Sequence, residues 1–155
     1  MTGKIDTTLK NLGITLPTAA AAVANYVPTV RSGNIVVVSG QITMENGTPQ
    51  FIGKLGRDFS VEQGQQAARL CALNVLAQLK GALDGDLDRV VRVIRLGVFV
   101  NGTDDFRDQP KVANGASDLM VQVFGDAGKH ARAAVGVNAL PLGVATEVEA
   151  LFEVM

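Results

Sequence analysis

The chain is poor in the side chains that build disulfides, metal centres and base-stacking surfaces. Its 155 residues contain one cysteine, Cys71, one histidine, His130, one tyrosine, Tyr26, and no tryptophan. A single cysteine cannot close an internal disulfide, and one cysteine with one histidine supplies too few ligands for a zinc-type centre. One tyrosine and six phenylalanines leave little for stacking nucleic-acid bases. We therefore expect no metal and no cofactor.

An excess of charge of one sign is also missing. The 14 lysines and arginines balance 15 aspartates and glutamates without forming a basic cluster, so the electrostatic footprint of a nucleic-acid-binding protein is absent. No apolar run approaches the roughly 18 residues of a membrane span, and the first residues lack the apolar core of a signal peptide. Neither nucleic acid nor a membrane is an expected partner, and a cytoplasmic location follows by default.

Apolar material, by contrast, is plentiful. At 47% hydrophobic residues the chain can bury one sizeable core, which is typical of a single domain. We expect residues 1–24 to form an N-terminal extension, a short helix followed by a linker, and residues 25–155 to form the domain itself.

Hydrophobic spacing predicts two large helices and several strands in the domain. One helix starts at the capping box of Ser60 and Gln63, and the other runs from Asp108 to Gly125. Period-two or continuous apolar patterns predict strands over residues 26–31, 35–42, 50–54 and 90–100, with a hairpin turn at Asn46-Gly47 between the second and third. This element order favours an α+β fold with both large helices on one face of a largely antiparallel sheet.

The only cysteine and histidine both have structural interpretations. Cys71 sits within the apolar stripe of the first large helix, where a small buried hydrophobe is favoured over a nucleophile. His130 follows a helix stop, and we interpret it as a surface residue, with a place beside Arg132 as the alternative.

The last part of the chain carries the strongest pattern. Residues 132–137 and 144–149 each alternate with period two, and Leu140-Pro141-Leu142-Gly143 between them has turn composition, so the pattern predicts a β-hairpin. With Pro141 and Leu142 as the central turn residues, Gly136 lies opposite Glu147 and Ala134 opposite Glu149.

In that hairpin Arg132, Glu147 and Glu149 share one face, above a floor of small residues. A guanidinium can bind a carboxylate through two hydrogen bonds, and a glutamate can orient a water molecule for attack. The alternative is a solvated face that carries an ordinary surface ion pair.

Two glycines suggest places where the backbone is approached closely. Gly40 ends the apolar run Ile35–Val38 after Ser39, so its N–H could hold a carboxylate or an oxyanion, although a bulge glycine is the alternative. Gly115 lies inside the second large helix, where glycine costs about 1 kcal/mol relative to alanine. A helix that keeps such a residue beside Asn114 suggests that something contacts its backbone.

Three motifs in this order are similar to those of a known family. They are a tyrosine in Asn25-Tyr26-Val27, the run from Gly33 to Ile42, and the final pattern from Arg132 through Leu140-Pro141 to Thr146-Glu147-Val148-Glu149-Ala150. Over roughly residues 25–154 the chain resembles the RidA/YjgF group of imine and enamine deaminases. Members of this group also carry the labels endoribonuclease L-PSP and translation inhibitor.

The resemblance implies a chorismate-mutase-like homotrimer with clefts between subunits. In the family, the arginine matching Arg132 binds the substrate carboxylate and the glutamate matching Glu147 positions the hydrolytic water. The residues matching Tyr26, Ser39, Gly40 and Asn114 line the same cleft. The expected reaction is hydrolysis of a reactive 2-imino or enamino acid to a 2-keto acid and ammonia.

One departure from the family pattern concerns substrate range. Ala134 stands where the archetypal deaminases have a cysteine, at a position that contributes largely through its backbone. Together with the N-terminal extension and an insertion around residues 107–113, it indicates a divergent subgroup. The alternative function is a trimer that binds small carboxylates without turning them over, and ribonuclease or translation-inhibitor activity is the third.

Overall fold

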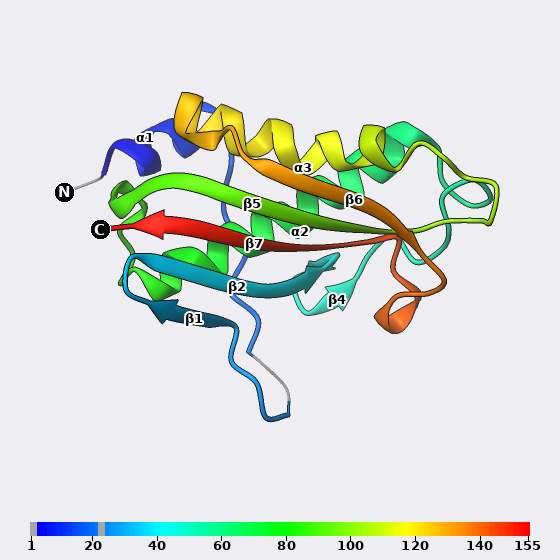
Figure 1. The fold of residues 1–155 in the computed structure, drawn as a ribbon, viewed down its shortest axis with the longest axis horizontal. Coiled ribbons are helices and arrows are strands. Elements are labelled where there is room, and N and C mark those ends of the chain that lie inside the picture. Colours follow the sequence, from blue (N-terminus) through cyan, green and yellow to red (C-terminus); the bar gives the residue numbers. More distant parts are fainter. Residues whose placement is uncertain (1–2, 22–23) are drawn as a thin grey trace.

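The fold is built on one five-stranded sheet. The computed structural model describes residues 3–21 and 24–155. The strands lie in the order β1-β2-β7-β5-β6, and all neighbours are antiparallel except β5 and β6, which are parallel (Figure 1). Their bounds are β1 Thr29–Ser32, β2 Ile35–Ile42, β5 Val90–Asn101, β6 Ala131–Val137 and β7 Thr146–Val154. The expected α+β fold with a mostly antiparallel sheet is confirmed.

Two large helices cover one face of this sheet. They are α2 Val61–Ala82 and α3 Gln109–Phe124, and a short helix, α1 Lys4–Asn11, comes first along the chain (Figure 1). The predicted capping box at the start of α2 is present, because Ser60 Oγ accepts from Gln63 N at 3.2 Å and Gln63 Oε1 accepts from Ser60 N at 2.9 Å. Alternate residues of β2, β5 and β7 face the helices and form the core with them, among them Val36, Val38, Leu96, Val98, Val148 and Phe152.

The glycine inside α3 serves helix packing. A Cβ at Gly115 would overlap the backbone carbonyl of Gln65 in α2, so only glycine permits this close crossing. The expectation that something contacts the backbone here is confirmed, but the partner is the neighbouring helix.

The predicted hairpin of the last two strands is wrong. β6 pairs with β5, so that Arg132 lies beside Leu96 and Gly136 beside Val100, and β7 lies on the other side of β5. The turn residues instead form a 3-10 segment, Pro141–Gly143, in a connection that passes over the end of β5, and Leu142 adopts a positive φ of 59°. Period-two patterns identify strands but not their neighbours, and the longer, more apolar β5 occupies the space between the two.

A smaller error concerns the predicted third strand. Asn46 and Gly47 do make a tight turn, both with positive φ, but it joins two-residue strands, β3 Met44–Glu45 and β4 Thr48–Pro49. Residues 50–54 contribute only an isolated bridge between Ile52 and Val144. Short 3-10 segments at Leu87–Arg89 and Gly125–Gly128 complete the described elements.

Among the described residues, no layer covers the second face of the sheet. Val30, Val37 and Leu151 form one cross-strand row on it, and Val135 lies on it at the far edge. The side chains of Val30, Val37 and Val135 are 53%, 42% and 46% exposed. We call this surface the open face. None of the helices in the described ranges combines the length and hydropathy that crossing a membrane requires.

Candidate functional site

Glu147 lies on the open face, directly over Gly40. On β2, Ser39 and Gly40 together oppose the single residue Glu149 of β7, which makes a β-bulge between Val38 and Gln41. A Cβ at position 40 would overlap the Glu147 carboxylate oxygen Oε2, so the glycine makes room for this carboxylate. The bulge interpretation of Gly40 is therefore confirmed, and the group that lies against this glycine belongs to the protein itself. Binding of a ligand carboxylate or oxyanion by the Gly40 N–H stays a prediction.

The Glu147 carboxylate is half-buried and without a compensating charge. No hydrogen bond or ion pair of its side chain occurs among the described residues. Burial, and then repulsion from Glu149 on the same face, raise the pKa of Glu147 above its ordinary value. A carboxylate held in this way is a better proton acceptor at neutral pH than a solvated glutamate.

Ser39 fixes the segment that carries Tyr26. Its hydroxyl donates to the Val27 carbonyl at 2.8 Å, and its backbone N–H donates to the Pro28 carbonyl at 2.9 Å. Tyr26 and Gly40 consequently line one cavity of about 220 Å³. The structure thus brings four residues together, namely Tyr26, Ser39, Gly40 and Glu147.

Arg132 belongs to a second cluster, on the helix-covered face. It projects from the edge strand β6 toward α3, where its Nη1 donates to Asn114 Oδ1 at 2.9 Å and to Ser117 Oγ at 3.1 Å. The guanidinium is exposed and, among the described residues, has no carboxylate partner. Two neutral acceptors thus hold Arg132 while its charge stays available to an anion.

Ser117 and His130 extend this cluster. His130 Nδ1 lies 2.6 Å from the Gly128 carbonyl and must donate to it, so in the neutral ring Nε2 accepts from Ser117 Oγ, 2.9 Å away. Ser117 Oγ therefore accepts a hydrogen bond from Arg132 and donates one to His130 Nε2. His130 is half-buried beside Arg132, which was the alternative interpretation of this residue. Nothing in the sequence marked Ser117, because a serine within a helix has no pattern of its own.

Within one chain the two clusters are not adjacent. Arg132 pairs with Leu96, which faces the helices, whereas Glu147 pairs with Phe99, on the opposite face of the same strand. The predicted sharing of one face by Arg132, Glu147 and Glu149 is therefore wrong. Ala134 is on the Arg132 face, two residues along β6, and packs against the core.

Cys71 is fully buried on α2. Its thiol contacts the carbonyl and the hydroxyl of Thr146, at 3.4 and 3.3 Å, and burial raises the pKa of Cys71 to about 12. It is a core residue, as predicted, and not a nucleophile. Over the described ranges, no three side chains of the His, Cys, Asp or Glu type are grouped as metal ligands.

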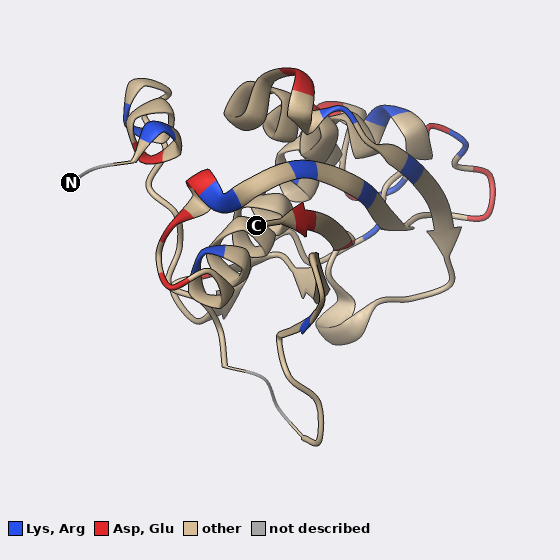
Figure 2. Cartoon of the chain, turned by 60° about the vertical axis from the view of Figure 1, so that its left-hand side comes forward, with Lys and Arg blue, Asp and Glu red and all other residues tan. Residues whose placement is uncertain are grey.

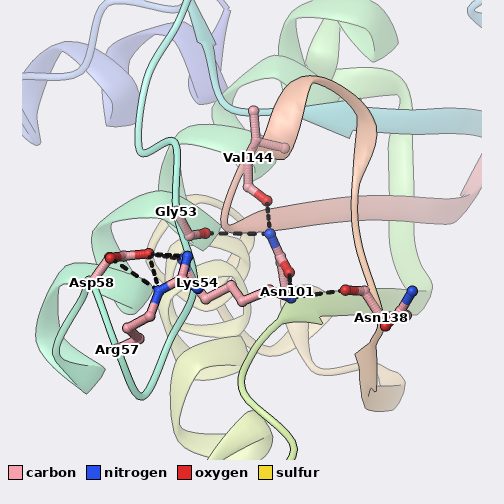
Figure 3. A network of polar contacts seen from close by, with 7 residues as sticks. All are labelled: Gly53, Lys54, Arg57, Asp58, Asn101, Asn138 and Val144. Atoms are coloured by element: carbon pink, nitrogen blue, oxygen red, sulfur yellow. Dashed lines mark hydrogen bonds and ion pairs between the residues drawn. The ribbon is translucent and has the colours of Figure 1, made fainter.

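A partly buried polar network fixes the connection between β6 and β7. Lys54 Nζ donates to Asn101 Oδ1 at 2.7 Å and to the Asn138 carbonyl at 2.8 Å (Figure 3). Asn101 Nδ2 in turn donates to the carbonyls of Val144 and Gly53, at 3.1 and 3.3 Å. Because Glu147 follows three residues after Val144, this network sets where β7 begins.

Charged side chains are spread over separate elements. Figure 2 shows lysines and arginines on helices, strands and loops, interspersed with acidic residues. On the open face Arg95 approaches Glu149 at 3.8 Å. The charges most relevant to a small ligand are therefore the two described above, on Arg132 and Glu147.

Comparison with known proteins identifies the family of the chain. The model of the YjgF/chorismate mutase-like family, also described as an endoribonuclease family, matches residues 6–154. The chain belongs to the YjgF family. Protein TCP17 of Trypanosoma cruzi is 52% identical to it over 97% of this chain and 94% of its own. A crystal structure of an Agrobacterium tumefaciens protein of unknown function is 49% identical, with a TM-score of 0.91 over 97% of this chain and 92% of that one.

A more distant YjgF relative carries the name of an enzyme. The 2-iminobutanoate/2-iminopropanoate deaminase of Dermatophagoides farinae is 27% identical, over 89% of this chain and 92% of its own. The family and its fold are thus shown, and the family includes a protein named as an imino acid deaminase.

Proposed function

We propose that the protein hydrolyses reactive 2-imino or enamino acids to 2-keto acids and ammonia. The observation that carries this proposal is the Glu147 carboxylate, half-buried, without a counter-charge and seated over the bare backbone of Gly40. Arg132 adds a carboxylate-binding group that two neutral residues hold in place. The deaminase name of one family member supports the same chemistry.

The reaction requires a positioned water molecule and a group that carries protons from the oxygen to the nitrogen. Glu147 accepts a proton from water as the oxygen attacks the imine carbon C2, which leaves a tetrahedral carbinolamine. That proton passes to the nitrogen, and Glu147 then takes the proton of the carbinolamine hydroxyl and delivers it to the nitrogen as well. The C–N bond breaks as the C=O bond forms, so the products are ammonia and the 2-keto acid. Arg132 binds the substrate carboxylate, an interaction worth roughly 1.5 to 3 kcal/mol for a charge-assisted hydrogen bond.

A complete site requires two copies of the chain. Arg132 and Glu147 lie on opposite faces of one sheet, so a single chain does not direct both at one ligand. The exposed valines of the open face favour its burial against another copy, and a closed ring of three copies buries each open face. In this homotrimer, Arg132 of one subunit faces Glu147, Gly40 and Tyr26 of the next across a cleft.

The experiment compares product release by three proteins of equal oligomeric state. Ammonia and keto acid are measured with 2-aminoacrylate and freshly generated imino acids, for the wild type, Arg132→Ala and Glu147→Gln. Acceleration by the wild type that both substitutions abolish supports the proposal. Retained binding of carboxylates without any turnover points to the alternative, a metabolite-binding trimer, and a ribonuclease activity lost in Arg132→Ala would support the third function.

A further inference from the structure

The cavity beside Gly40 has a wall that the N-terminal extension supplies. It measures about 220 Å³, and Ala20 and Ala21 line one side of it. The cavity is also lined by Tyr26, Ile42, Met44 and Leu142. Gly40 lines this cavity, and the Glu147 carboxylate lies against the same residue, so Gly40 is the point that the cavity and the carboxylate of the proposed reaction share.

The wall is anchored to the core of the domain. Gln78, a buried residue of α2, donates from Nε2 to the Ala20 carbonyl at 2.7 Å. Asn74, one turn earlier, donates to the carbonyls of Ile42 and Met44 at 3.3 and 2.9 Å. The amide groups of both residues therefore hold backbone in place on two sides of the cavity.

What remains available to a ligand is mostly apolar. Among the described residues, no aspartate, glutamate, lysine or arginine lines this cavity, so a charged group placed in it would lose its hydration without gaining a counter-ion. Leu142 is 63% exposed and holds a positive φ of 59°, which is unusual for a bulky residue. Strain of this kind persists where the surrounding structure requires it, and here it presents an apolar side chain to the cavity.

We infer that this cavity selects the side chain of the substrate, and that Ala20 and Ala21 of the extension limit its length. The inference rests on the proposed function and adds a substrate class: imino acids with an uncharged, apolar side chain of moderate length. The volume is about seven times the ~30 Å³ share of one water molecule, which is room for a chain of four or five carbons. Substrates with acidic or basic side chains are excluded.

Ligand binding can be followed without turnover. Tyr26 is the only tyrosine and the chain has no tryptophan, so the intrinsic fluorescence comes from a residue that lines the cavity. The probes are straight-chain 2-keto acids from 2-oxobutanoate to 2-oxooctanoate, with 2-oxoglutarate as the charged probe. Calorimetry on the same samples checks the dissociation constants.

Two alanine-to-leucine variants distinguish an effect of the cavity wall on ligand affinity from an effect of the rest of the linker. Ala20→Leu adds bulk at a residue that lines this cavity, whereas Ala19→Leu makes the same change one residue earlier. Ala19 lines a neighbouring cavity that Ala20 also borders, but it does not line this one. We expect the wild type to bind 2-oxohexanoate at least ten-fold more tightly than 2-oxoglutarate. Ala20→Leu should lose ten-fold or more for 2-oxohexanoate but little for 2-oxobutanoate, and Ala19→Leu should match the wild type.

Equal affinities for the neutral and charged probes, or equal behaviour of the two variants, would overturn the inference. The outcome is separable from that of the proposed function. Chain-length selection without imine hydrolysis contradicts the reaction alone, and imine hydrolysis whose kcat/KM ignores both chain length and Ala20→Leu contradicts the cavity assignment alone. Neither binding nor hydrolysis of any member of the series would reject both.

Discussion

At the scale of single residues, Glu147 lies in surroundings that disfavour its ionised form. Glu147 is half-buried on β7, close to Glu149 and without a compensating cation among the described residues. A carboxyl group whose pKa is raised on folding binds its proton more tightly in the folded state. Ionisation of Glu147 therefore lowers the stability of the fold, which is characteristic of a residue kept for its chemistry.

Glu147→Gln should accordingly raise stability while lowering activity. The stability that protonated Glu147 contributes is fully present below the pKa of an unfolded glutamate and is lost as pH rises through the higher pKa of the folded state. The variant should thus have a higher Tm than the wild type at pH 8, and the two curves should converge near pH 4. Thermal melts across pH measure this. A Tm deficit at pH 8 would show that the carboxylate stabilises the fold.

The same carboxyl group should shape the pH profile of catalysis. Activity requires ionised Glu147, so kcat/KM should fall toward acid pH with an inflection above the ordinary pKa of glutamate, and Glu147→Gln should lose on the order of 10²-fold. Glu149→Gln removes the repulsive neighbour and should move the inflection to lower pH. An inflection that stays in place in Glu149→Gln would contradict this assignment.

At the scale of secondary-structure elements, the sequence pattern predicted which helices and strands form better than it predicted which strands lie side by side. The capping box at Ser60, the apolar stripe around Cys71 and the run from Ile35 to Val38 identified α2 and β2 correctly. The last two strands were also found, but not that β5 separates them, because alternation along a strand says nothing about which strand lies beside it. Because of that one error, Arg132 was predicted to lie on the same face of the sheet as Glu147, whereas the two lie on opposite faces.

For the candidate site, too, the sequence identified residues better than it predicted which of them lie together. Arg132, Glu147, Tyr26 and Gly40 were singled out by residue type and by resemblance, and the structure places them in two clusters rather than one. Ser117 could not be found in advance, because its contact with Arg132 depends on how α3 lies against the edge strand.

The close crossing of α2 and α3 can be tested with a pair of glycine substitutions. Gly115→Ala places a methyl group against the Gln65 carbonyl and should destabilise the protein by about 1–3 kcal/mol. Gly81→Ala, near the end of α2, meets nothing within 4 Å and should stabilise it by up to about 1 kcal/mol, from the better helix propensity of alanine. Urea denaturation of both variants measures the difference. Equal stabilities would mean that the helices can separate at Gly115 without cost.

At the scale of the whole molecule, the open face underlies the proposal that a complete site needs more than one chain. Val30, Val37 and Val135 are exposed there, and the two functional clusters point to opposite sides of the sheet. Association of three copies would bury the valines and bring Arg132 of one subunit to Glu147 of another. Light scattering should accordingly give a mass three times the 16.2 kDa of one chain.

The central claim is that each active site combines Arg132 of one subunit with Glu147 of its neighbour. The most direct measurement is the deaminase activity of trimers co-expressed from Arg132→Ala and Glu147→Gln chains, each inactive alone. Random assembly of equal amounts places an intact Arg132 beside an intact Glu147 in one interface in four, so about a quarter of the wild-type activity should return. Hybrid trimers without activity, made from variants of wild-type mass and stability, would contradict the shared site.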